Sequence, residues 1–343
     1  MSSYRELIPL TVLTGFLGSG KTTLLNRWLR DPRLSDAAVL INEFGEIGLD
    51  HQLVEPIDGA PVLLANGCVC CSIRDDLKSA LLRLDERRRI GEVPAYRRLI
   101  IETTGLADPV PILSTLLNDP ELRHHYRLGA VLTTVDAING PGDLARREEA
   151  WKQVAVADRL LISKEDLAPP AAIAALRERL AAINPRAVLG RAADADAGLL
   201  QAADVYDPQA HPADFAAWLG GDAPAAHAHH HGAPYQAVNV VLEDAIDWTA
   251  FGLWLTMLLH VHGNRILRVK GLLHVQDSTT PVVVNGVQHL VHPPFHLARW
   301  PDADRRSRLV FITEGLDAGA LRESLAVFNG LGARLRTAAG AAA

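Results

Sequence analysis

Residues 15–22 read Gly-Phe-Leu-Gly-Ser-Gly-Lys-Thr and match the pattern G-x-x-x-x-G-K-[ST] at every fixed position. The apolar, β-branched run at 8–14 is typical of a buried strand, and residues 22–30 have helical spacing. A strand, a glycine-rich loop and a helix in this register predict a phosphate-binding loop (P-loop), because backbone N–H groups and the positive end of the helix surround phosphates. A glycine-rich turn without a ligand is the alternative, and the register disfavours it.

The positions of this loop predict individual contacts with a nucleotide. Lys21 is expected to reach the β- and γ-phosphates, and the Thr22 hydroxyl is expected to hold Mg²⁺. The nucleotide-binding residues predicted here are Gly15, Gly18, Ser19, Gly20, Lys21, Thr22 and Thr23.

The composition excludes several classes of function. The 343 residues are 48% hydrophobic and 22% charged, and the formal net charge is −6. Without a basic excess to neutralise phosphates, a general nucleic-acid binder is not expected. No apolar run reaches the roughly 18 residues that a membrane-spanning helix needs, and the N-terminus lacks the apolar region of a signal peptide. We therefore expect no membrane association and a cytoplasmic location.

Up to about residue 205, short apolar runs alternate with amphipathic stretches, which predicts an α/β fold with a parallel sheet covered by helices. The predicted strands are 11–14, 38–42, 61–65, 98–102, 128–135, 159–163 and 187–189, and the predicted helices are 22–30, 74–86, 109–117, 143–156 and 170–183.

The composition changes at residues 207–234 to Pro, Ala, Gly, Asp and His, which is typical of a linker, and its His-rich tract at 227–231 is a candidate low-specificity metal-capture site. The predicted organisation is therefore a P-loop domain (1–206), this linker, a smaller α+β domain (235–337) and a disordered tail (338–343). In the second domain we expect strands at 236–242, 265–274, 280–284, 288–292 and 309–312 and helices at 248–259 and 318–328.

All three cysteines of the chain, Cys68, Cys70 and Cys71, fall within four residues. They follow a predicted strand, so they are expected on a loop at the same end of the sheet as the P-loop, where metal binding or redox chemistry is favoured over a disulfide. Three thiolates suit Zn²⁺ or Cu(I) but leave a tetrahedral site open. A fourth ligand could come from Glu43, Glu46 or His51 in the acidic loop 42–51, from water or from a partner.

Two further strand ends carry polar residues. Glu102 ends a buried strand and Gly105 follows it, an arrangement in which the carboxylate serves Mg²⁺ and the glycine N–H meets the γ-phosphate. Later, Lys164 and Asp166 fit the guanine-reading pattern [N/T]-K-x-D, with Ser163 in place of Asn or Thr. A carboxylate at Asp166 can accept hydrogens from two neighbouring nitrogens of guanine. We therefore predict a guanine nucleotide, and we see no glutamine to position the attacking water.

The order of these motifs resembles the family of CobW-type metallochaperone GTPases, which includes cobalamin-synthesis, nitrile-hydratase-activator and zinc-transfer branches. The matching segments, which extend across most of the chain, are G-F-L-G-S-G-K-T-T-L-L-N at 15–26, N-E-F-G-E-I-G-L-D at 42–50, G-C-V-C-C-S at 67–72, E-T-T-G-L-A-D-P at 102–109, S-K-E-D at 163–166 and R-I-L-R-V-K-G at 265–271.

The resemblance implies a slow GTPase whose nucleotide state changes the affinity of a metal site built from Cys68, Cys70 and Cys71, and a client protein that receives the metal. Zinc is the expected ion, with cobalt as the alternative. Cobalt or iron delivery for cobalamin synthesis or nitrile hydratase maturation stays open as a function. A redox- or metal-regulated GTPase switch, a small-molecule kinase and a nucleotide-independent metal buffer are the competing interpretations.

Overall fold

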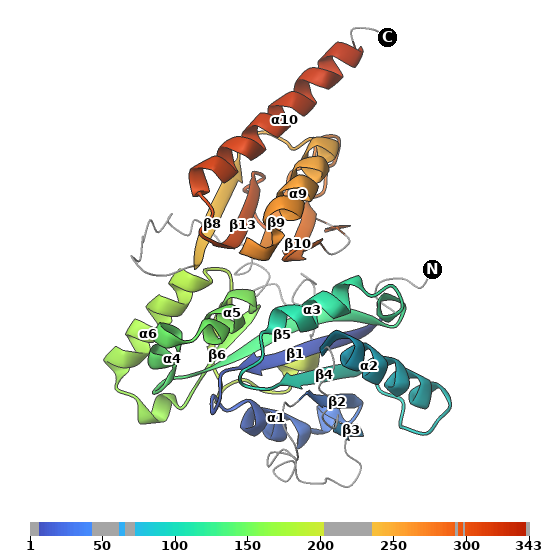
Figure 1. Ribbon diagram of the computed structural model, residues 1–343, viewed down its shortest axis with the longest axis vertical. Coiled ribbons are helices and arrows are strands. Elements are labelled where there is room, and N and C mark those ends of the chain that lie inside the picture. Colours follow the sequence, from blue (N-terminus) through green and yellow to red (C-terminus); the bar gives the residue numbers. More distant parts are fainter. Residues whose placement is uncertain are drawn as a thin grey trace. The chain divides into compact units, whose positions relative to one another are not determined.

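The computed structural model describes residues 7–42, 62–65, 73–201, 235–291, 294–297 and 299–340. The chain divides into two compact units, Met1–Trp218 and Leu219–Ala343 (Figure 1). The acidic loop at 43–51, the cysteine loop at 66–72 and the linker at 207–234 lie outside the described residues.

The first unit is built from alternating strands and helices, as its hydrophobic pattern predicts. Its described strands are β1 (Ile8–Gly15), β2 (Ala37–Asn42), β3 (Val62–Ala65), β4 (Arg98–Thr103), β5 (Tyr126–Asp136), β6 (Arg159–Ser163) and β7 (Val188–Arg191). Its α-helices are α1 (Lys21–Leu29), α2 (Ile73–Arg89), α3 (Pro109–Asn118), α4 (Gly140–Arg146), α5 (Glu148–Val156), α6 (Pro170–Ile183) and α7 (Gly198–Gln201). Short 3-10 helices are η2 (Pro32–Leu34), η4 (Leu122–His124) and η5 (Glu165–Leu167).

The described strands of this unit form a seven-stranded sheet in the order β3-β2-β4-β1-β5-β6-β7, and every pairing is parallel. β1 lies between β4 and β5, and the side chains of Leu10, Val12 and Leu13 are fully buried there. From β1 the chain crosses over β4 to reach β2, whereas from β4 it crosses over β1 to reach β5. Because such crossovers are right-handed, α1 and α3 cover opposite faces (Figure 1). The carboxyl end of β1 is therefore the switch point where α/β sheets bind ligands.

The structure corrects one predicted helix of the first unit. The stretch 143–156 is two helices, because Arg147 between α4 and α5 has extended backbone angles of φ −124° and ψ 119°. The local charges explain the break. Arg146 lies in the last turn of α4, and Glu148 and Glu149 lie in the first turn of α5, so each charge faces the helix end of opposite sign.

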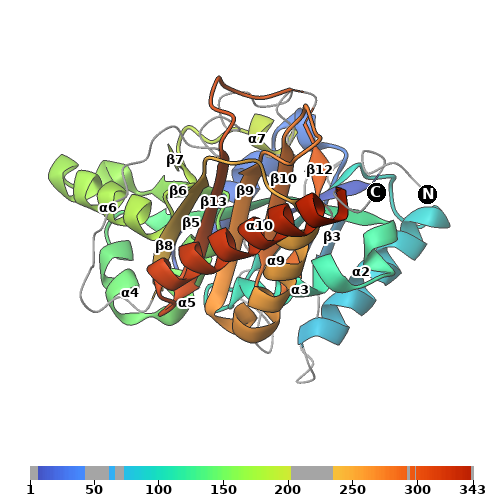
Figure 2. The ribbon, with the colours of Figure 1, turned by 90° about the horizontal axis from the view of Figure 1, so that it is seen from above.

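The second unit is a smaller α+β domain. Its strands are β8 (Tyr235–Leu242), β9 (Ile266–Leu273), β10 (Val282–Val287), β11 (Leu290–Val291), β12 (Phe295–His296) and β13 (Ser307–Glu314), and its helices are α9 (Trp248–His262), η6 (Gly263–Arg265) and α10 (Ala318–Gly340). The described strands form an antiparallel sheet in the order β11-β10-β9-β13-β8, and β12 also pairs with β10. Figure 2 shows β8, β13, β9 and β10 side by side.

Two predictions for this unit need correction at their boundaries. The strand expected at 288–292 is reduced to β11, because β10 runs on to Val287 and Gln288 takes a positive φ of 51° in the turn. α10 reaches Gly340, so the first three residues of the segment expected to be a disordered tail are helical.

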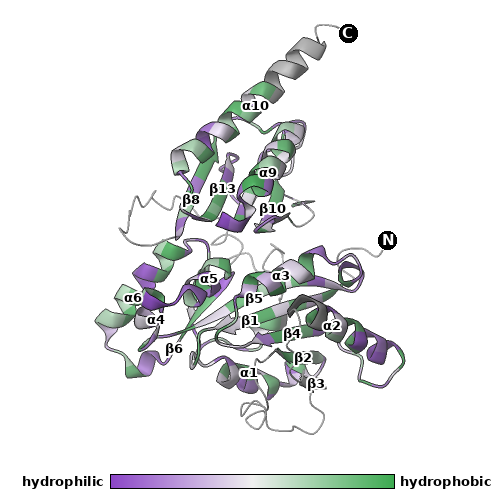
Figure 3. Cartoon of the chain, viewed as in Figure 1, coloured by the Kyte–Doolittle hydropathy of each residue, from purple (hydrophilic) through white to green (hydrophobic). Residues whose placement is uncertain are grey.

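The core of the second unit lies between its sheet and its two long helices. Phe251, Trp254 and Leu255 of α9 pack with Phe311 of β13 and Leu325 of α10, and the Trp254 and Phe311 rings meet edge to face at 5.9 Å. Figure 3 shows hydrophobic colouring along α9, whose 15 residues include no Asp, Glu, Lys or Arg. Burial of these aromatic side chains stabilises the unit.

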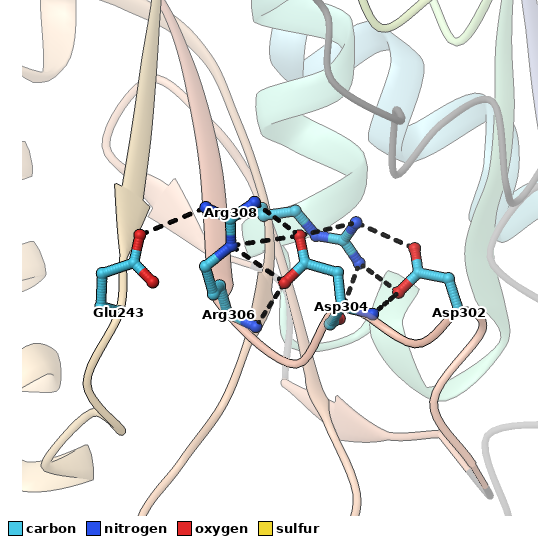
Figure 4. A network of polar contacts seen from close by, with 5 residues as sticks. All are labelled: Glu243, Asp302, Asp304, Arg306 and Arg308. Atoms are coloured by element: carbon cyan, nitrogen blue, oxygen red, sulfur yellow. Dashed lines mark hydrogen bonds and ion pairs between the residues drawn. The ribbon is translucent and has the colours of Figure 1, made fainter.

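A network of ion pairs holds the chain that enters β13 (Figure 4). Arg308, 8% exposed, donates two hydrogen bonds to Asp302, at 2.9 and 3.1 Å. Arg306 pairs with Asp304 at 3.0 Å and with Glu243, just beyond β8, at 3.2 Å. The hydrogen bonds from Arg306 lower the pKa of Asp304 to about 2. The loop at 302–306 is thereby joined to the β8 edge of the sheet.

Candidate nucleotide-binding site

The loop between β1 and α1 is shaped by its three glycines. Gly15, Gly18 and Gly20 have φ values of 142°, 70° and 90°, a region that side chains rarely adopt. At Gly15 there is no space either, since an added Cβ would lie 2.4 Å from the backbone oxygen of Thr134. The loop is thus curled in a way that only glycine at these positions permits, as its P-loop pattern predicts.

The backbone N–H groups in the first turn of α1 have no carboxylate within that turn that would compete with a bound anion. The turn contains no Asp or Glu, so its positive end is open to an anion. Thr22 is half-buried and Thr23 is exposed. Ser19 is buried instead: its hydroxyl is 2.7 Å from the Thr134 hydroxyl, and its N–H donates to the Phe16 carbonyl at 3.1 Å. The Ser19 side chain therefore ties the loop to β5, and it does not point to solvent.

The Lys21 side chain is held by backbone carbonyls of the P-loop. Its ammonium donates to the carbonyls of Gly15 at 2.8 Å and Phe16 at 3.2 Å, and the residue is 7% exposed. These contacts place a positive charge beside the open N-terminus of α1. The arrangement fits a group with several negative charges, such as a chain of phosphates.

The two predicted Mg²⁺ residues meet in the structure. The Thr22 hydroxyl donates to Oε1 of Glu102 at 2.6 Å. Glu102 is 4% exposed and lies opposite Leu13 in the neighbouring strand, which brings the end of β4 to the P-loop. A carboxylate and a hydroxyl are oxygen ligands of the kind that Mg²⁺ prefers, so the pair fits this ion.

Gly105 lies directly against the P-loop. A Cβ at this position would be 2.6 Å from the backbone nitrogen and 2.7 Å from the Cα of Leu17. Such distances are shorter than real Cβ contacts, so the chain approaches as closely here as only glycine allows. The turn that follows β4 and the loop that follows β1 therefore form one surface.

The predicted base-reading turn is attached to the other side of the P-loop. The Ser163 hydroxyl donates to the Ser19 carbonyl at 2.7 Å. Lys164, with a left-handed φ of 57°, donates from Nζ to the Gly18 carbonyl at 2.9 Å and to Oδ2 of Asp136 at 2.6 Å. Ser163 thus bridges the turn to the P-loop through its hydroxyl, a group that Thr also carries, whereas Asn would donate from its amide nitrogen.

The two acids of this turn have different surroundings. Glu165 is bound by Arg177 at 2.8 Å and Arg191 at 2.7 Å, so its charge is used within the protein. Asp166 is exposed. Of the two, Asp166 has the exposed carboxylate, and its role in reading guanine stays a prediction.

Asp136 is a site residue that the sequence analysis did not identify. It is 2% exposed and accepts from the backbone of Ile138 at 2.7 Å, from Asn139 and from Lys164. Burial alone would raise the pKa of this carboxyl, but the hydrogen bonds from Lys164 and Asn139 lower it overall. The signal was an acid at the end of a predicted strand followed by Asn at i+3, a pattern that forms a local turn.

The predicted metal ligands Cys68, Cys70, Cys71 and Glu43 lie outside the described residues. Within the described ranges, no group of three or more His, Cys, Asp or Glu side chains is arranged to hold a metal ion. None of the described helices is long and apolar enough to cross a bilayer.

A parallel α/β sheet with this loop, lysine and acid defines a P-loop nucleotide-binding protein. Comparison with protein families gives two matches: the CobW/HypB/UreG nucleotide-binding domain at residues 9–189, and the cobalamin synthesis protein CobW C-terminal domain at residues 235–329. The chain belongs to the CobW family, as its motifs predict.

Individual relatives agree with this assignment. The zinc chaperone YjiA of Escherichia coli is 33% identical over 330 residues, which cover 93% of this chain and 98% of that protein. The zinc chaperone CobW of Pseudomonas aeruginosa is 29% identical over 93% of this chain and 90% of its own length. The crystal structure of Zn(II)-bound YjiA GTPase from E. coli superposes with a TM-score of 0.72 at 28% identity, covering 94% of this chain and 99% of that one.

Proposed function

We propose that this protein is a GTP-hydrolysing zinc metallochaperone: it binds GTP at the P-loop, holds Zn²⁺ at the cysteine loop in a nucleotide-dependent way, and delivers the ion to a client protein. The contact between Thr22 and Glu102 beside the Lys21 ammonium carries the nucleotide part of the proposal. The zinc part rests on the full-length similarity to YjiA, which is named a zinc chaperone, and on the three clustered cysteines of this chain.

In the proposed reaction, water attacks the γ-phosphorus and the bond to the bridging oxygen breaks, leaving GDP and phosphate. Lys21, the N-terminus of α1 and the Gly105 N–H stabilise the negative charge on the phosphoryl oxygens. Thr22 and Glu102 would hold Mg²⁺, which supplies further charge neutralisation when bound. Lys164 and Asp166 select guanine. We expect slow turnover, because the sequence motifs include no glutamine in position to orient the attacking water.

The proposed coupling between nucleotide and metal is thermodynamic linkage. β2 and β3 are paired in parallel, so their carboxyl ends, which precede the acidic loop and the cysteine loop in the sequence, lie at the same end of the sheet. GTP favours the arrangement in which a residue such as Glu43 completes the site of Cys68, Cys70 and Cys71. A coupling free energy of about 1–3 kcal/mol would change zinc affinity roughly 5- to 150-fold.

A competition titration tests this proposal. Zn²⁺ and Co²⁺ are titrated against a chromophoric chelator in the presence of Mg²⁺ with either GDP or a non-hydrolysable GTP analogue, on the wild type and on Cys70→Ser/Cys71→Ser. The proposal expects tighter Zn²⁺ binding with the GTP analogue and loss of that binding in the double variant. Equal affinity with both nucleotides would contradict the coupling, and a preference for Co²⁺ would replace zinc with cobalt as the delivered ion.

A further inference from the structure

The turn at 104–107, between β4 and α3, brings Gly105 to the P-loop but has few backbone hydrogen bonds of its own. The Ala107 N–H donates to the Thr104 carbonyl at 3.1 Å, and the Leu106 N–H donates to the Thr104 hydroxyl at 3.2 Å. The carbonyls of Gly105 and Ala107 lie between β4 and α3, outside the regular hydrogen bonding of helices and strands. A turn that contains glycine has many accessible conformations unless such groups are held.

One side chain holds both carbonyls. Nε2 of Gln153, from α5, donates to the Gly105 carbonyl at 3.1 Å and to the Ala107 carbonyl at 3.0 Å. Only the NH₂ end of the amide can donate to two acceptors, so its orientation is determined. Gln153 is 1% exposed, and its backbone carbonyl accepts from the Thr133 hydroxyl of β5 at 2.8 Å. The helix backbone that carries this side chain is thus fixed to β5 while the amide holds the turn.

The amide makes these contacts although its other end is not satisfied. Oε1 of Gln153 is buried and has no hydrogen-bond partner among the described residues. An acceptor in that condition disfavours folding, whereas an apolar side chain of similar size would avoid the loss. Among the described residues, the hydrogen bonds of this amide therefore go to the turn alone.

The neighbouring residue holds the next part of the same segment. Lys152 donates to Oδ2 of Asp108 at 3.0 Å, and Oδ1 of Asp108 accepts from the Val110 N–H at the start of α3. Burial opposes the charge of Lys152, yet its contacts with Glu148 and Asp108 raise its pKa. Two successive residues of α5 therefore bind the chain from Gly105 to Asp108.

We propose that Gln153 is a positioning residue for GTP hydrolysis: it keeps Gly105 against the P-loop, so that its N–H meets the γ-phosphate. This inference rests on the proposed GTPase function. It assigns Gln153 no contact with nucleotide or water, because both N–H groups of its amide are taken by the turn. The effect of its loss should fall on steps that involve the γ-phosphate and should leave GDP binding intact.

The test uses the full chain with two variants and a matched control. Gln153→Leu removes both donors with similar volume, and Gln153→Glu keeps the shape but turns a carboxylate toward two carbonyls. Gln276→Leu is the control, because it removes one amide hydrogen bond to a backbone carbonyl, that of Ala245 at 3.1 Å, in the second unit. Single-turnover hydrolysis, the affinities for GDP and a GTP analogue, and hydrogen exchange at 104–108 are measured.

In both Gln153 variants we expect the single-turnover rate and the preference for the GTP analogue over GDP to fall about 10- to 100-fold, as for the loss of two buried hydrogen bonds. GDP affinity should stay near the wild-type value, and exchange at 104–108 should accelerate. Gln276→Leu should change none of these. Folded Gln153 variants with wild-type exchange and wild-type preference would overturn the inference.

The two proposals fail in distinguishable ways. If the wild type hydrolyses no GTP, the proposed function is wrong, whereas accelerated exchange at 104–108 in the Gln153 variants would still show that this amide holds the turn. If hydrolysis is normal in the wild type and also in folded Gln153 variants, the inference is wrong while the GTPase function stands.

Discussion

Replacing Gly105 by alanine tests the close approach of the β4–α3 turn to the P-loop. The added Cβ would lie 2.6 Å from the Leu17 nitrogen and 2.7 Å from its Cα. The Leu17 side chain is 54% exposed and can rotate away, but its backbone cannot. To reach the 3.4 Å at which ordinary contact begins, the turn and the P-loop must separate by roughly 0.8 Å.

That separation predicts a specific loss. A misplacement of about 1 Å in a catalytic arrangement costs about 100-fold in rate, so Gly105→Ala should hydrolyse bound GTP about two orders of magnitude more slowly. Overpacking of this kind destabilises by about 1–3 kcal/mol, a cost that a folded domain of this size can tolerate. The variant should therefore fold and retain GDP, because the three glycines of the P-loop and Lys21 are unchanged.

The assay is single-turnover hydrolysis with saturating Mg²⁺, together with GDP affinity and unfolding in urea. Gly190→Ala is the matched control, since a Cβ there would meet only the Leu161 Cδ2 atom at an ordinary 3.6 Å in the same unit. If Gly105→Ala folds and hydrolyses GTP at the wild-type rate, the reasoning from the contact with Leu17 is refuted.

Three other predictions concern stability and the metal ion. The lowered pKa of Asp136 stabilises the wild type fully above about pH 4, and this contribution is lost as the pH falls through that pKa. Asp136→Asn should lack the contribution, so the unfolding free energies of wild type and variant should differ at neutral pH and converge in acid. Thr22→Ala removes the hydroxyl that contacts Glu102, and the Mg²⁺ concentration for half-maximal hydrolysis should rise about 10- to 100-fold. Gly252→Ala in α9, where an added Cβ meets open space, should stabilise the second unit by about 0.5–1 kcal/mol in thermal unfolding.

Much of the fold was predictable because its signals are local. Each predicted strand of the first unit overlaps an observed one, since buried parallel strands are short β-branched runs between turns. α6 begins at Pro170 and ends at Ile183 as predicted, because a proline at the first position sets its start. The break at Arg147 was missed, since apolar spacing continues across it and only the change of charge sign marks the helix ends.

The site was predictable to the extent that its residues lie in one motif. The residues at 15–22 were identified together, and Glu102 and Gly105 were identified by their distance from a strand end. Gln153 was missed because its partners Gly105 and Ala107 are 48 and 46 residues away, so no local pattern relates them. Asp136 was missed because an acid followed by Asn at i+3 is a common turn pattern, and the sequence does not reveal its contact with Lys164 at the end of the neighbouring strand β6.

The most direct test of the account is whether zinc leaves the protein when GTP is hydrolysed. The protein is loaded with one equivalent of Zn²⁺ and with Mg²⁺ and GTP, and phosphate release and zinc transfer to a chromophoric chelator are followed in the same sample. The account predicts that zinc appears at the rate of hydrolysis and stays bound with the non-hydrolysable analogue. Zinc release at the same rate with either nucleotide would contradict it.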